Sequence, residues 1–561
     1  MEIFKGIAAS PGIQTGEAVC IYPVSAEIDA ALINEERAEE ETALFQKAVR
    51  DVKERLGLAI ADARGRKGAE TAEILEAHVS ILEDEEFINE VIAKIRQERH
   101  CAAYAVDTVT QKYFQEFSAL GDPVFRERGA DIKDLGSRII LSILGKNRQL
   151  FIPSAGEGLI ALAHEFTPSD LVECAAAKVS AIVAETGTLT AHTAIMANNL
   201  RITAVLGASG IMGAFVNGDR VIVDGEEGLV IRNPDEATEQ KYREKRASYL
   251  RYLEDLKTLR DLPAVTNDGS RTVRLAANIS SAGNCAEAID SGAEGVGVFR
   301  TEFYFVECGA PPGEEEQFQI YRETAQKFAP HSVVIRTLDI GGDKNIPYIA
   351  IPPEMNPFMG WRGIRLCLDM RDLFKCQLRA MLRASAYGNV HIMYPMISDL
   401  RDLNAANAVL YQAKAELEEE GASFNAQVPV GVMIEVPSAA ILADQLVQKV
   451  DFFSIGTNDL TQYTLAVDRN NEKIALRYDP MHTAVLRLIK HVAETAHRHG
   501  KWVGVCGEMA GDKNAAAVLV GLGIDELSMN IANILPVKHA IRNMSVADAL
   551  AAAENAIQRL S

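Results

Sequence analysis

The spacing of apolar and polar residues changes along this 561-residue chain. Between about residues 34 and 145, apolar side chains recur every three or four positions among many charges, for example over 72–96, which predicts amphipathic helices. Between residues 158 and 232, short apolar runs alternate with turns and predict the strands of a compact α/β domain. Residues 235–262 return to helical spacing with dense charge and predict a linker helix.

From Pro263 onward, strand-like runs alternate with helical stretches. The runs begin at Val273, Gly295, Ser332, Gly363, Val390, Val430, Asp451 and Trp502, and the one at Gly363 is short and irregular. Eight β–α units over about 300 residues predict a (β/α)8 barrel, whose active site is expected at the carboxyl ends of the strands. The chain as a whole is therefore expected to be an α/β multidomain protein.

Side chains able to bind a charged substrate follow several of these runs. Glu435 and Asp459 come after two neighbouring runs, so a barrel of parallel strands would bring them to one mouth. Carboxylate oxygens are ligands that Mg²⁺ prefers, and Arg469 lies ten residues beyond Asp459. This pattern predicts a magnesium-dependent phosphoryl-transfer site. Other polar residues at or just beyond expected strand ends are Arg300, Arg336, Asp339, Asn458 and Cys506, the last after the eighth run.

Composition narrows the possible partners. With 78 acidic and 57 basic side chains the formal charge is −21, which opposes nucleic acid and anionic membranes and favours a basic protein partner. The eight cysteines form no C-x-x-C pair, and the first residues carry no basic segment followed by a long apolar one. No run approaches the roughly 18 apolar residues of a membrane span. We therefore expect a cytoplasmic protein without membrane insertion.

Longer motifs resemble enzyme I of the phosphoenolpyruvate:sugar phosphotransferase system, and the resemblance runs from end to end. In the barrel region the motifs are VFRTEF from Val298, IRTLDIGGDK from Ile335, NPFMGWR from Asn356, DFFSIGTNDLTQYTLAVDR from Asp451 and VCGEMAG from Val505. In the N-terminal half they are ASPG from Ala9, HVSILEDEE from His78 and GTLTAHTAIMA from Gly187.

The resemblance implies a domain organisation. A swivelling α/β phosphohistidine domain would comprise residues 1–33 and 146–234. A helical subdomain that binds the phosphocarrier protein HPr would be inserted at 34–145, with Glu70, Glu73, Glu83 and Asp84 as candidate contacts. The linker helix (235–262) would lead to a phosphoenolpyruvate-binding (β/α)8, or TIM, barrel at 263–561, through which the family forms a homodimer.

The resemblance also implies the reaction. Phosphoenolpyruvate would donate its phosphoryl group to His192, pyruvate would leave, and the histidine would pass the group to HPr in the first step of sugar transport. A neutral imidazole is a good nucleophile near pH 7, and an expected helix start at His192 favours an added phosphate. Glu435 and Asp459 would bind Mg²⁺, and Cys506 would protonate the enolpyruvate. The residues implied to hold substrate oxygens are Arg300, Arg336, Lys344, Arg362, Asn458 and Arg469.

The histidine segment departs from the family run Gly-Gly-Arg-Thr-Ser-His. Leu189 and Ala191 stand in place of the Arg and Ser, and Asn198 replaces a second Arg after the histidine. A charge-assisted hydrogen bond is worth about 1.5–3 kcal/mol, so we expect the phosphorylated state to be less stabilised than in a typical member.

Two alternatives remain open. A phosphoenolpyruvate synthase or pyruvate phosphate dikinase shares the histidine domain and barrel but needs a large ATP-binding domain, and no Gly-rich phosphate loop precedes His192. A regulatory relative would bind phosphoenolpyruvate or HPr and transfer poorly, which Leu189 and Asn198 favour.

Overall fold

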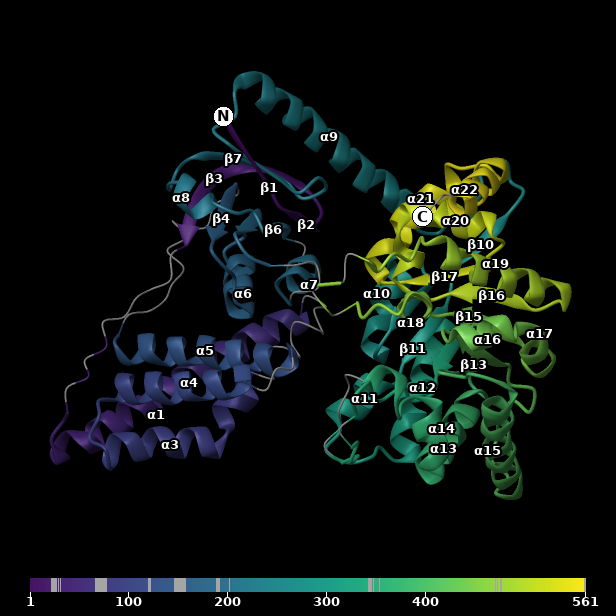
Figure 1. The fold of residues 1–561 in the computed structure, drawn as a ribbon, viewed down its shortest axis with the longest axis horizontal. Coiled ribbons are helices and arrows are strands. Elements are labelled where there is room, and N and C mark those ends of the chain that lie inside the picture. The colour runs from purple at the N-terminus through teal and green to yellow at the C-terminus, as the bar shows by residue number, and fades with distance from the viewer. Residues whose placement is uncertain are drawn as a thin grey trace. The chain divides into compact units, whose positions relative to one another are not determined.

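A computed structural model of the chain describes residues 1–21, 28, 30, 32–65, 78–119, 123–145, 158–187, 192–200, 202–341, 346, 348–352, 354–469, 471, 473–474 and 477–558. The chain divides into two compact units, Met1–Tyr252 and Leu253–Ser561 (Figure 1). Among the sequence-predicted residues, Glu70, Glu73, Leu189, Ala191 and Lys344 lie outside the described part.

The first unit contains an eight-stranded mixed sheet. Its order is β1-β8-β7-β3-β4-β5-β6-β2, with β3, β4, β5 and β6 parallel to their neighbours in that series. The short apolar run of β5 (Ala181–Ala184) is buried at every position, as expected for a strand covered on both faces. The other strands are β1 (Glu2–Lys5), β2 (Ile7–Ser10), β3 (Ile13–Ile21), β4 (Leu159–Ala163), β6 (Thr203–Leu206), β7 (Arg220–Asp224) and β8 (Leu229–Arg232). Helices α6 (Pro168–Ala176), α7 (His192–Asn199) and α8 (Ile211–Ala214) accompany them, so the prediction of an α/β fold here is confirmed.

Helices occupy the region where amphipathic spacing predicts them. Four helices share one apolar cluster. Each contributes a fully buried residue to it, namely Phe45, Val91, Val106 and Ile139. Asp84 caps α3 by accepting hydrogen bonds from the backbone N–H groups of Glu86 and Phe87. The helices are α1 (Glu35–Gly65), α3 (Glu85–Arg96), α4 (Ala102–Ala119) and α5 (Pro123–Ile143), and the predicted linker helix is α9 (Glu236–Thr258).

The second unit is a closed barrel of parallel strands, as predicted. Consecutive strands from β10 to β17 pair in parallel, and β10 also pairs with both β11 and β17, which closes the ring. The strands are β10 (Thr272–Ile279), β11 (Val296–Arg300), β12 (Ser332–Arg336), β13 (Asn389–Tyr394), β14 (Val430–Ile434), β15 (Phe452–Ile455), β16 (Trp502–Val505) and β17 (Glu526–Met529), and a short β9 (Ala264–Val265) pairs antiparallel with β10.

Helices surround this ring (Figure 1). Helix α19 (Thr483–Arg498) is typical, because it buries Val485, Ile489, Val492 and Ala496 at helical spacing. The others are α10 (Cys285–Asp290), α11 (Glu302–Glu307), α12 (Glu314–Phe328), α13 (Ile364–Asp369), α14 (Arg371–Ala384), α15 (Leu400–Glu419), α16 (Pro437–Ile441), α17 (Ala443–Leu446), α18 (Thr457–Leu465), α20 (Lys513–Gly521), α21 (Ile534–Arg542) and α22 (Val546–Gln558). No helix of the described residues is long and apolar enough to span a bilayer.

Two strand predictions are wrong in detail. The apolar run after Gly363 is helix α13: Ile364 and Cys367, three residues apart, are both buried, which helical spacing allows on one face, whereas a strand would turn them to opposite faces. The fourth barrel strand is instead β13, and the eighth is β17, a run with two polar residues that the apolar pattern did not reveal. Cys506 therefore follows the seventh strand, β16.

The amino-terminal end of the barrel is filled by aromatic and charged side chains. Trp502 stacks on Phe452 with ring centroids 4.5 Å apart, and the Arg274 guanidinium lies 4.7 Å from the Trp502 ring. The His391 ring lies 5.6 Å from that of Phe452. Burial first, and Arg274 second, lower the pKa of His391 to about 4.

This buried imidazole should make the barrel sensitive to acid. An unfolded histidine takes up a proton near pH 6.5, whereas folded His391 resists protonation until about pH 4. The contribution of neutral His391 to the stability of the fold is therefore complete above pH 6.5 and is lost as the pH falls toward 4. We expect about 3 kcal/mol of unfolding free energy to be lost across this window. Denaturant unfolding at pH 7 and pH 4.5 should show a smaller pH effect in His391→Phe. The exposed His331→Gln is the control, and equal pH effects in both variants would contradict the prediction.

Candidate active site

The carboxyl ends of three neighbouring strands are aligned. Ile434 pairs with Ile455, and Ile455 pairs with Val505. The next residue of each strand is Glu435, Gly456 or Cys506, and the Cys506 N–H donates to the Ile455 carbonyl. This alignment places the predicted carboxylate and thiol at one mouth of the barrel. On the other side of the ring, Arg300 pairs in register with Arg336.

Glu435 and Asp459 meet at this mouth. Glu435 is 2% exposed, and its Oε1 accepts a hydrogen bond of 2.6 Å from the Met396 N–H. Asp459 lies in the first turn of α18, directly after β15. Burial raises the pKa of Glu435 to about 8, and the carboxylates of Asp459 and Asp339 raise it as well. A cation between these carboxylates would relieve both effects.

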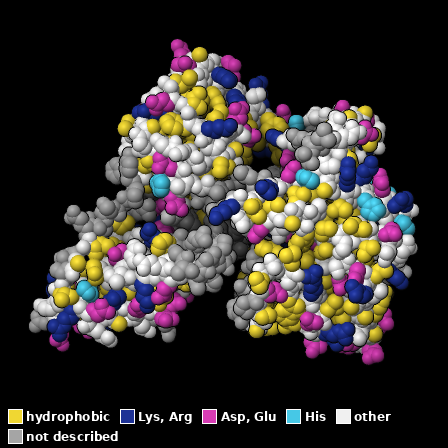
Figure 2. Space-filling view, in the orientation of Figure 1, with side chains coloured by type: hydrophobic (Ala, Val, Ile, Leu, Met, Phe, Trp, Pro, Cys, Tyr) yellow, Lys and Arg dark blue, Asp and Glu magenta, His cyan; other side chains and the backbone are white. Residues whose placement is uncertain are grey.

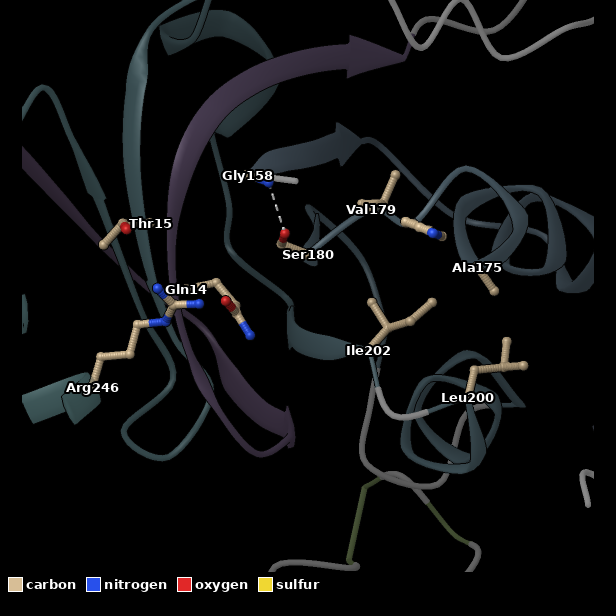
Figure 3. A pocket seen from close by; sticks show the side chains of 10 residues that line it. Gln14, Thr15, Gly158, Ala175, Val179, Ser180, Leu200, Ile202 and Arg246 are labelled. Atoms are coloured by element: carbon tan, nitrogen blue, oxygen red, sulfur yellow. Dashed lines mark hydrogen bonds between the residues drawn. The ribbon is translucent and has the colours of Figure 1, made fainter. Parts of the chain in front are cut away.

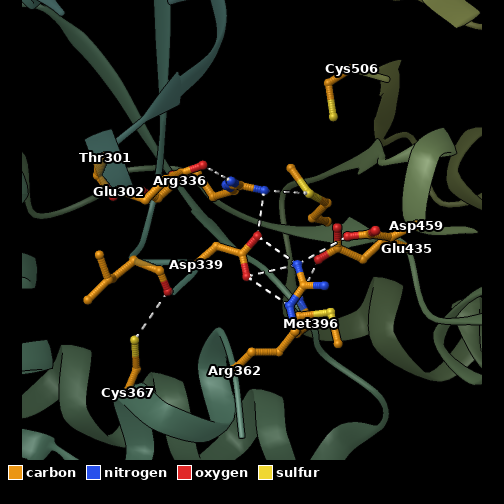
Figure 4. A network of polar contacts seen from close by, with 12 residues as sticks. Thr301, Glu302, Arg336, Asp339, Arg362, Cys367, Met396, Glu435, Asp459 and Cys506 are labelled. Carbon is orange, nitrogen blue, oxygen red and sulfur yellow. Dashed lines mark hydrogen bonds and ion pairs between the residues drawn. The ribbon is translucent and has the colours of Figure 1, made fainter. Parts of the chain in front are cut away.

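Two arginines flank a central carboxylate, Asp339 (Figure 4). Arg336 Nη1 lies 3.0 Å from Asp339 Oδ2, and its Nη2 lies 2.5 Å from Glu302 Oε1. Arg362 Nη2 lies 3.0 Å from Asp339 Oδ2 and 3.1 Å from Asp459 Oδ2. Although burial alone would lower the pKa of both guanidiniums, these carboxylates raise it. Both arginines are therefore fixed cations in the barrel mouth.

The other predicted substrate residues are placed differently. Arg300 ends β11 and Arg469 follows α18, and within the described residues neither guanidinium forms an ion pair with a carboxylate. Asn458 Nδ2 donates to Glu508 Oε1 at 3.1 Å, and its Oδ1 accepts from the Glu508 N–H at 3.0 Å. Asn458 thus holds the segment after β16.

Cys506 is a buried thiol, 6% exposed, in an apolar cluster with Met393 and Met433. Its Sγ lies 3.6 Å from the Ile455 carbonyl oxygen. Burial raises the pKa of Cys506 to about 11, and Glu435 adds to the shift. The Asn278 side chain donates to the Cys506 carbonyl at 3.1 Å. The thiol therefore stays protonated at neutral pH, as a proton donor requires.

Glu302 and Tyr463 join the network although the sequence did not point to them, and Asp339, expected only as a polar residue beyond a strand end, lies at its centre. Glu302 and Asp339 hold the arginines, and Tyr463 accepts a hydrogen bond of 3.1 Å from Arg362 Nη1 while it donates to the Phe358 carbonyl. The helical spacing of Asp459 and Tyr463, four residues apart, would have placed both on one face of α18.

In the first unit, α7 begins at His192, as predicted. The next residue, Thr193, donates its hydroxyl to the Phe166 carbonyl at 3.1 Å and ties this helix start to the segment before α6. The exposed Asn198 lies near the other end of α7. The side chain of His192 lies outside the described part, so the structure supports its position in the backbone only.

A separate hollow of about 570 Å³ lies in the first unit (Figure 3). It is lined by apolar side chains such as Val179 and Ile202, by hydroxyl and amide groups, and by the basic residues Lys178 and Arg246. The Gly158 N–H donates to Ser180 Oγ at 3.1 Å on its wall. The described residues that line this hollow include none of the sequence-predicted site residues.

Comparison with known proteins identifies the family. Models of the PEP-utilising enzymes match residues 5–128 ("N-terminal"), 155–228 ("mobile domain") and 254–546 ("PEP-binding domain"). A phosphoenolpyruvate-protein phosphotransferase of Priestia megaterium is 42% identical to the chain and aligns over 97% of it and 94% of the relative. The chain belongs to the phosphoenolpyruvate-protein phosphotransferases. The barrel mouth lies in the region that matches the PEP-binding domain of this family.

Other relatives of the same name align over nearly the whole chain as well. The phosphoenolpyruvate-protein phosphotransferase of Haemophilus influenzae is 40% identical and aligns over 99% of this chain and 96% of its own length. An NMR solution structure of Enzyme I (nEIt) is 38% identical over 44% of this chain and 99% of that chain, with a TM-score of 0.38. The resemblance seen in the sequence is confirmed at the level of the family.

Proposed function

We propose that this protein transfers the phosphoryl group of phosphoenolpyruvate to its own His192 and then to the phosphocarrier protein HPr, releasing pyruvate. The observation that carries the proposal is the set of groups at one barrel mouth: two carboxylates, the guanidiniums of Arg336 and Arg362, and a protonated thiol. A loose phosphoryl transition state needs fixed positive charge and positioning more than covalent help. Membership of the family supports this substrate.

Glu435 and Asp459 are the residues that we propose to hold Mg²⁺. Their oxygens are hard ligands, and burial first, with the neighbouring carboxylates of Asp459 and Asp339 second, raises the pKa of Glu435. Among the described residues, no group of three or more His, Cys, Asp or Glu is positioned to hold a metal ion, so substrate oxygens would complete the ligand set. When bound, Mg²⁺ supplies positive charge beside the phosphoryl and enolate oxygens.

The arginines would bind and orient the substrate. Arg300 and Arg469 have no carboxylate partner among the described residues, so they can take the phosphoryl and carboxylate oxygens. Arg336 and Arg362 stay anchored to Asp339 and add fixed charge, Arg362 near the developing enolate. Asn458 would position the substrate and the Cys506 segment, and Lys344 remains a predicted phosphate ligand outside the described residues.

The reaction has two steps, phosphoryl transfer to His192 and protonation of the enolate. An imidazole nitrogen of His192 forms a bond to phosphorus, the P–O bond to the enol oxygen breaks, and its electron pair stays on that oxygen. The Cys506 thiol gives its proton to the methylene carbon of the enolate, which yields pyruvate. Because the barrel and HPr are two different partners for one imidazole, a rigid-body movement of the histidine domain is expected.

Replacing Cys506 with alanine should separate binding from chemistry. Phosphoenolpyruvate should bind about as well as to the parent, whereas pyruvate formation should fall by roughly 10²–10⁴-fold, the usual contribution of a general acid. Isothermal titration and a lactate-dehydrogenase-coupled pyruvate assay measure the two quantities. The buried Cys367→Ala, whose thiol contacts the Leu338 carbonyl, is the matched control. An unchanged pyruvate rate in Cys506→Ala would make this thiol structural.

The acidic composition suits a basic carrier. Figure 2 shows acidic and basic side chains interspersed over the described residues of the visible face. Glu83 already pairs with Lys53 at 2.7 Å and Asp84 caps α3, so each has a structural role beside its predicted contact with HPr. These contacts, the homodimer through the barrel, the domain boundaries given above and a cytoplasmic location remain predictions.

Radioactive phosphoenolpyruvate tests the function as a whole. With Mg²⁺, the purified chain should acquire one acid-labile, base-stable phosphoryl group for each pyruvate released and lose it when HPr is added. Binding of phosphoenolpyruvate without labelling would indicate the regulatory relative instead, and labelling that requires ATP would indicate a synthase or dikinase.

A further inference from the structure

The Arg362 guanidinium connects two carboxylates with different expected roles. It lies 3.0 Å from Asp339 and 3.1 Å from Asp459, the proposed magnesium ligand (Figure 4). The side chain is only 7% exposed, and Tyr463 accepts from its Nη1 at 3.1 Å. The Arg362 guanidinium therefore already binds an Asp459 oxygen that a metal ion would use.

We propose that Arg362 and a divalent cation compete for Asp459, so that Arg362 limits metal binding until an anionic substrate is present. This inference rests on the proposed function. A guanidinium N–H and a metal ion need the same carboxylate lone pairs, and two cations a few ångströms apart in a buried site repel each other strongly.

The geometry gives Arg362 a second position without leaving its anchor. Asp339 accepts from Arg362 Nη2 at both oxygens, at 3.2 and 3.0 Å, and from its Nε at 3.4 Å. A metal ion on Asp459 would thus displace one contact of the guanidinium and leave the buried pair with Asp339 in place. The released N–H group would then face the mouth, where a substrate anion can accept it.

Metal and substrate should consequently favour each other. Substrate oxygens that draw Arg362 away from Asp459 would raise the affinity for the metal, and by linkage the metal would raise the affinity for the substrate by the same factor. Substrate oxygens that complete the ligand set would favour the metal as well, and the release of Asp459 by Arg362 would add to that effect.

Arg336 provides a matched comparison. It is buried to a similar extent, with 9% of its side chain exposed, and lies at the same 3.0 Å from Asp339. Its second carboxylate partner is Glu302, not Asp459. Removing either guanidinium deletes one positive charge from the same mouth, but only the loss of Arg362 frees an oxygen of Asp459.

The test is the affinity of the full chain for Mn²⁺ without phosphoenolpyruvate, measured from the electron paramagnetic resonance signal of free Mn²⁺. Arg362→Met should bind Mn²⁺ about tenfold more tightly than Arg336→Met, since a charge-assisted hydrogen bond to Asp459 is removed only in the first variant. Equal affinities in the two variants would overturn the competition and leave a general charge effect.

Two further variants separate failure of the competition from failure of the proposed function. Glu435→Gln in the parent should weaken Mn²⁺ binding, and if it has no effect in any variant, the metal assignment of the proposed function fails and the competition fails with it. If Arg362→Met does not fold, judged by circular dichroism, Arg362→Gln replaces it, because glutamine can still donate to Asp339. The same ratio to Arg336→Met decides the question.

Discussion

His192→Ala should abolish the formation of the phosphorylated protein. The proposed route passes through a bond between an imidazole nitrogen and phosphorus, and alanine offers no nucleophile. Residue 192 begins helix α7, and the backbone N–H groups at a helix start would favour an added phosphate; Thr193 anchors this helix start. We therefore expect no acid-labile label from radioactive phosphoenolpyruvate and no transfer to HPr, while the barrel should still bind phosphoenolpyruvate.

The control is His164, an exposed histidine of the same domain. His164 lies after β4, where its Nδ1 is 2.8 Å from Glu185 Oε2, and His164→Ala should keep full labelling. Labelling and binding are measured on the same preparations. Full labelling of His192→Ala would exclude this residue as the acceptor, and loss of label in both variants together with loss of the fold would point to a structural role.

The sequence predicts the architecture well where the hydrophobic pattern is strong. The buried parallel strands of the barrel read as short apolar runs, and most are found at the predicted positions. The pattern fails where it is ambiguous: Ile364–Asp369 is apolar enough for a strand but forms a helix, and Glu526–Met529 is a strand with a buried carboxylate paired to Arg274 at 3.5 Å. A polar residue inside a strand is visible only when its tertiary partner is known.

The site shows a similar division. Strand ends predict which residues share the barrel mouth, because register carries Glu435 and Cys506 to one level. Sequence cannot show the pairing among them. Arg336 and Arg362 share Asp339. Arg300 and Arg469 have no carboxylate partner among the described residues. These differences depend on how side chains from segments far apart in the chain are placed.

Glu435→Gln should nearly eliminate metal-dependent transfer while leaving the protein at least as stable. Glutamine keeps the volume and can still accept from the Met396 N–H, but it lacks the charge that a hard divalent cation needs. Charge stabilisation by a catalytic metal is worth several kcal/mol, so the rate of phosphohistidine formation should fall by roughly 100- to 1000-fold. Rapid-quench labelling at saturating Mg²⁺ measures this rate, with the exposed Glu419→Gln on α15 as the control.

The stability of the same variant should change in the opposite direction, which separates a functional carboxylate from a structural one. Burial and neighbouring carboxylates raise the pKa of Glu435 to about 8, so the folded state retains a proton that the unfolded chain releases near pH 4.5. The contribution of Glu435 to the stability of the parent therefore falls as the pH rises from about 4.5 to 8, and glutamine removes that loss. Thermal unfolding in buffer with a chelator should show Glu435→Gln gaining on the parent with increasing pH. A variant that is both inactive and less stable at every pH would mean that Glu435 supports the fold, and the magnesium ligand would then have to be sought elsewhere in the barrel mouth.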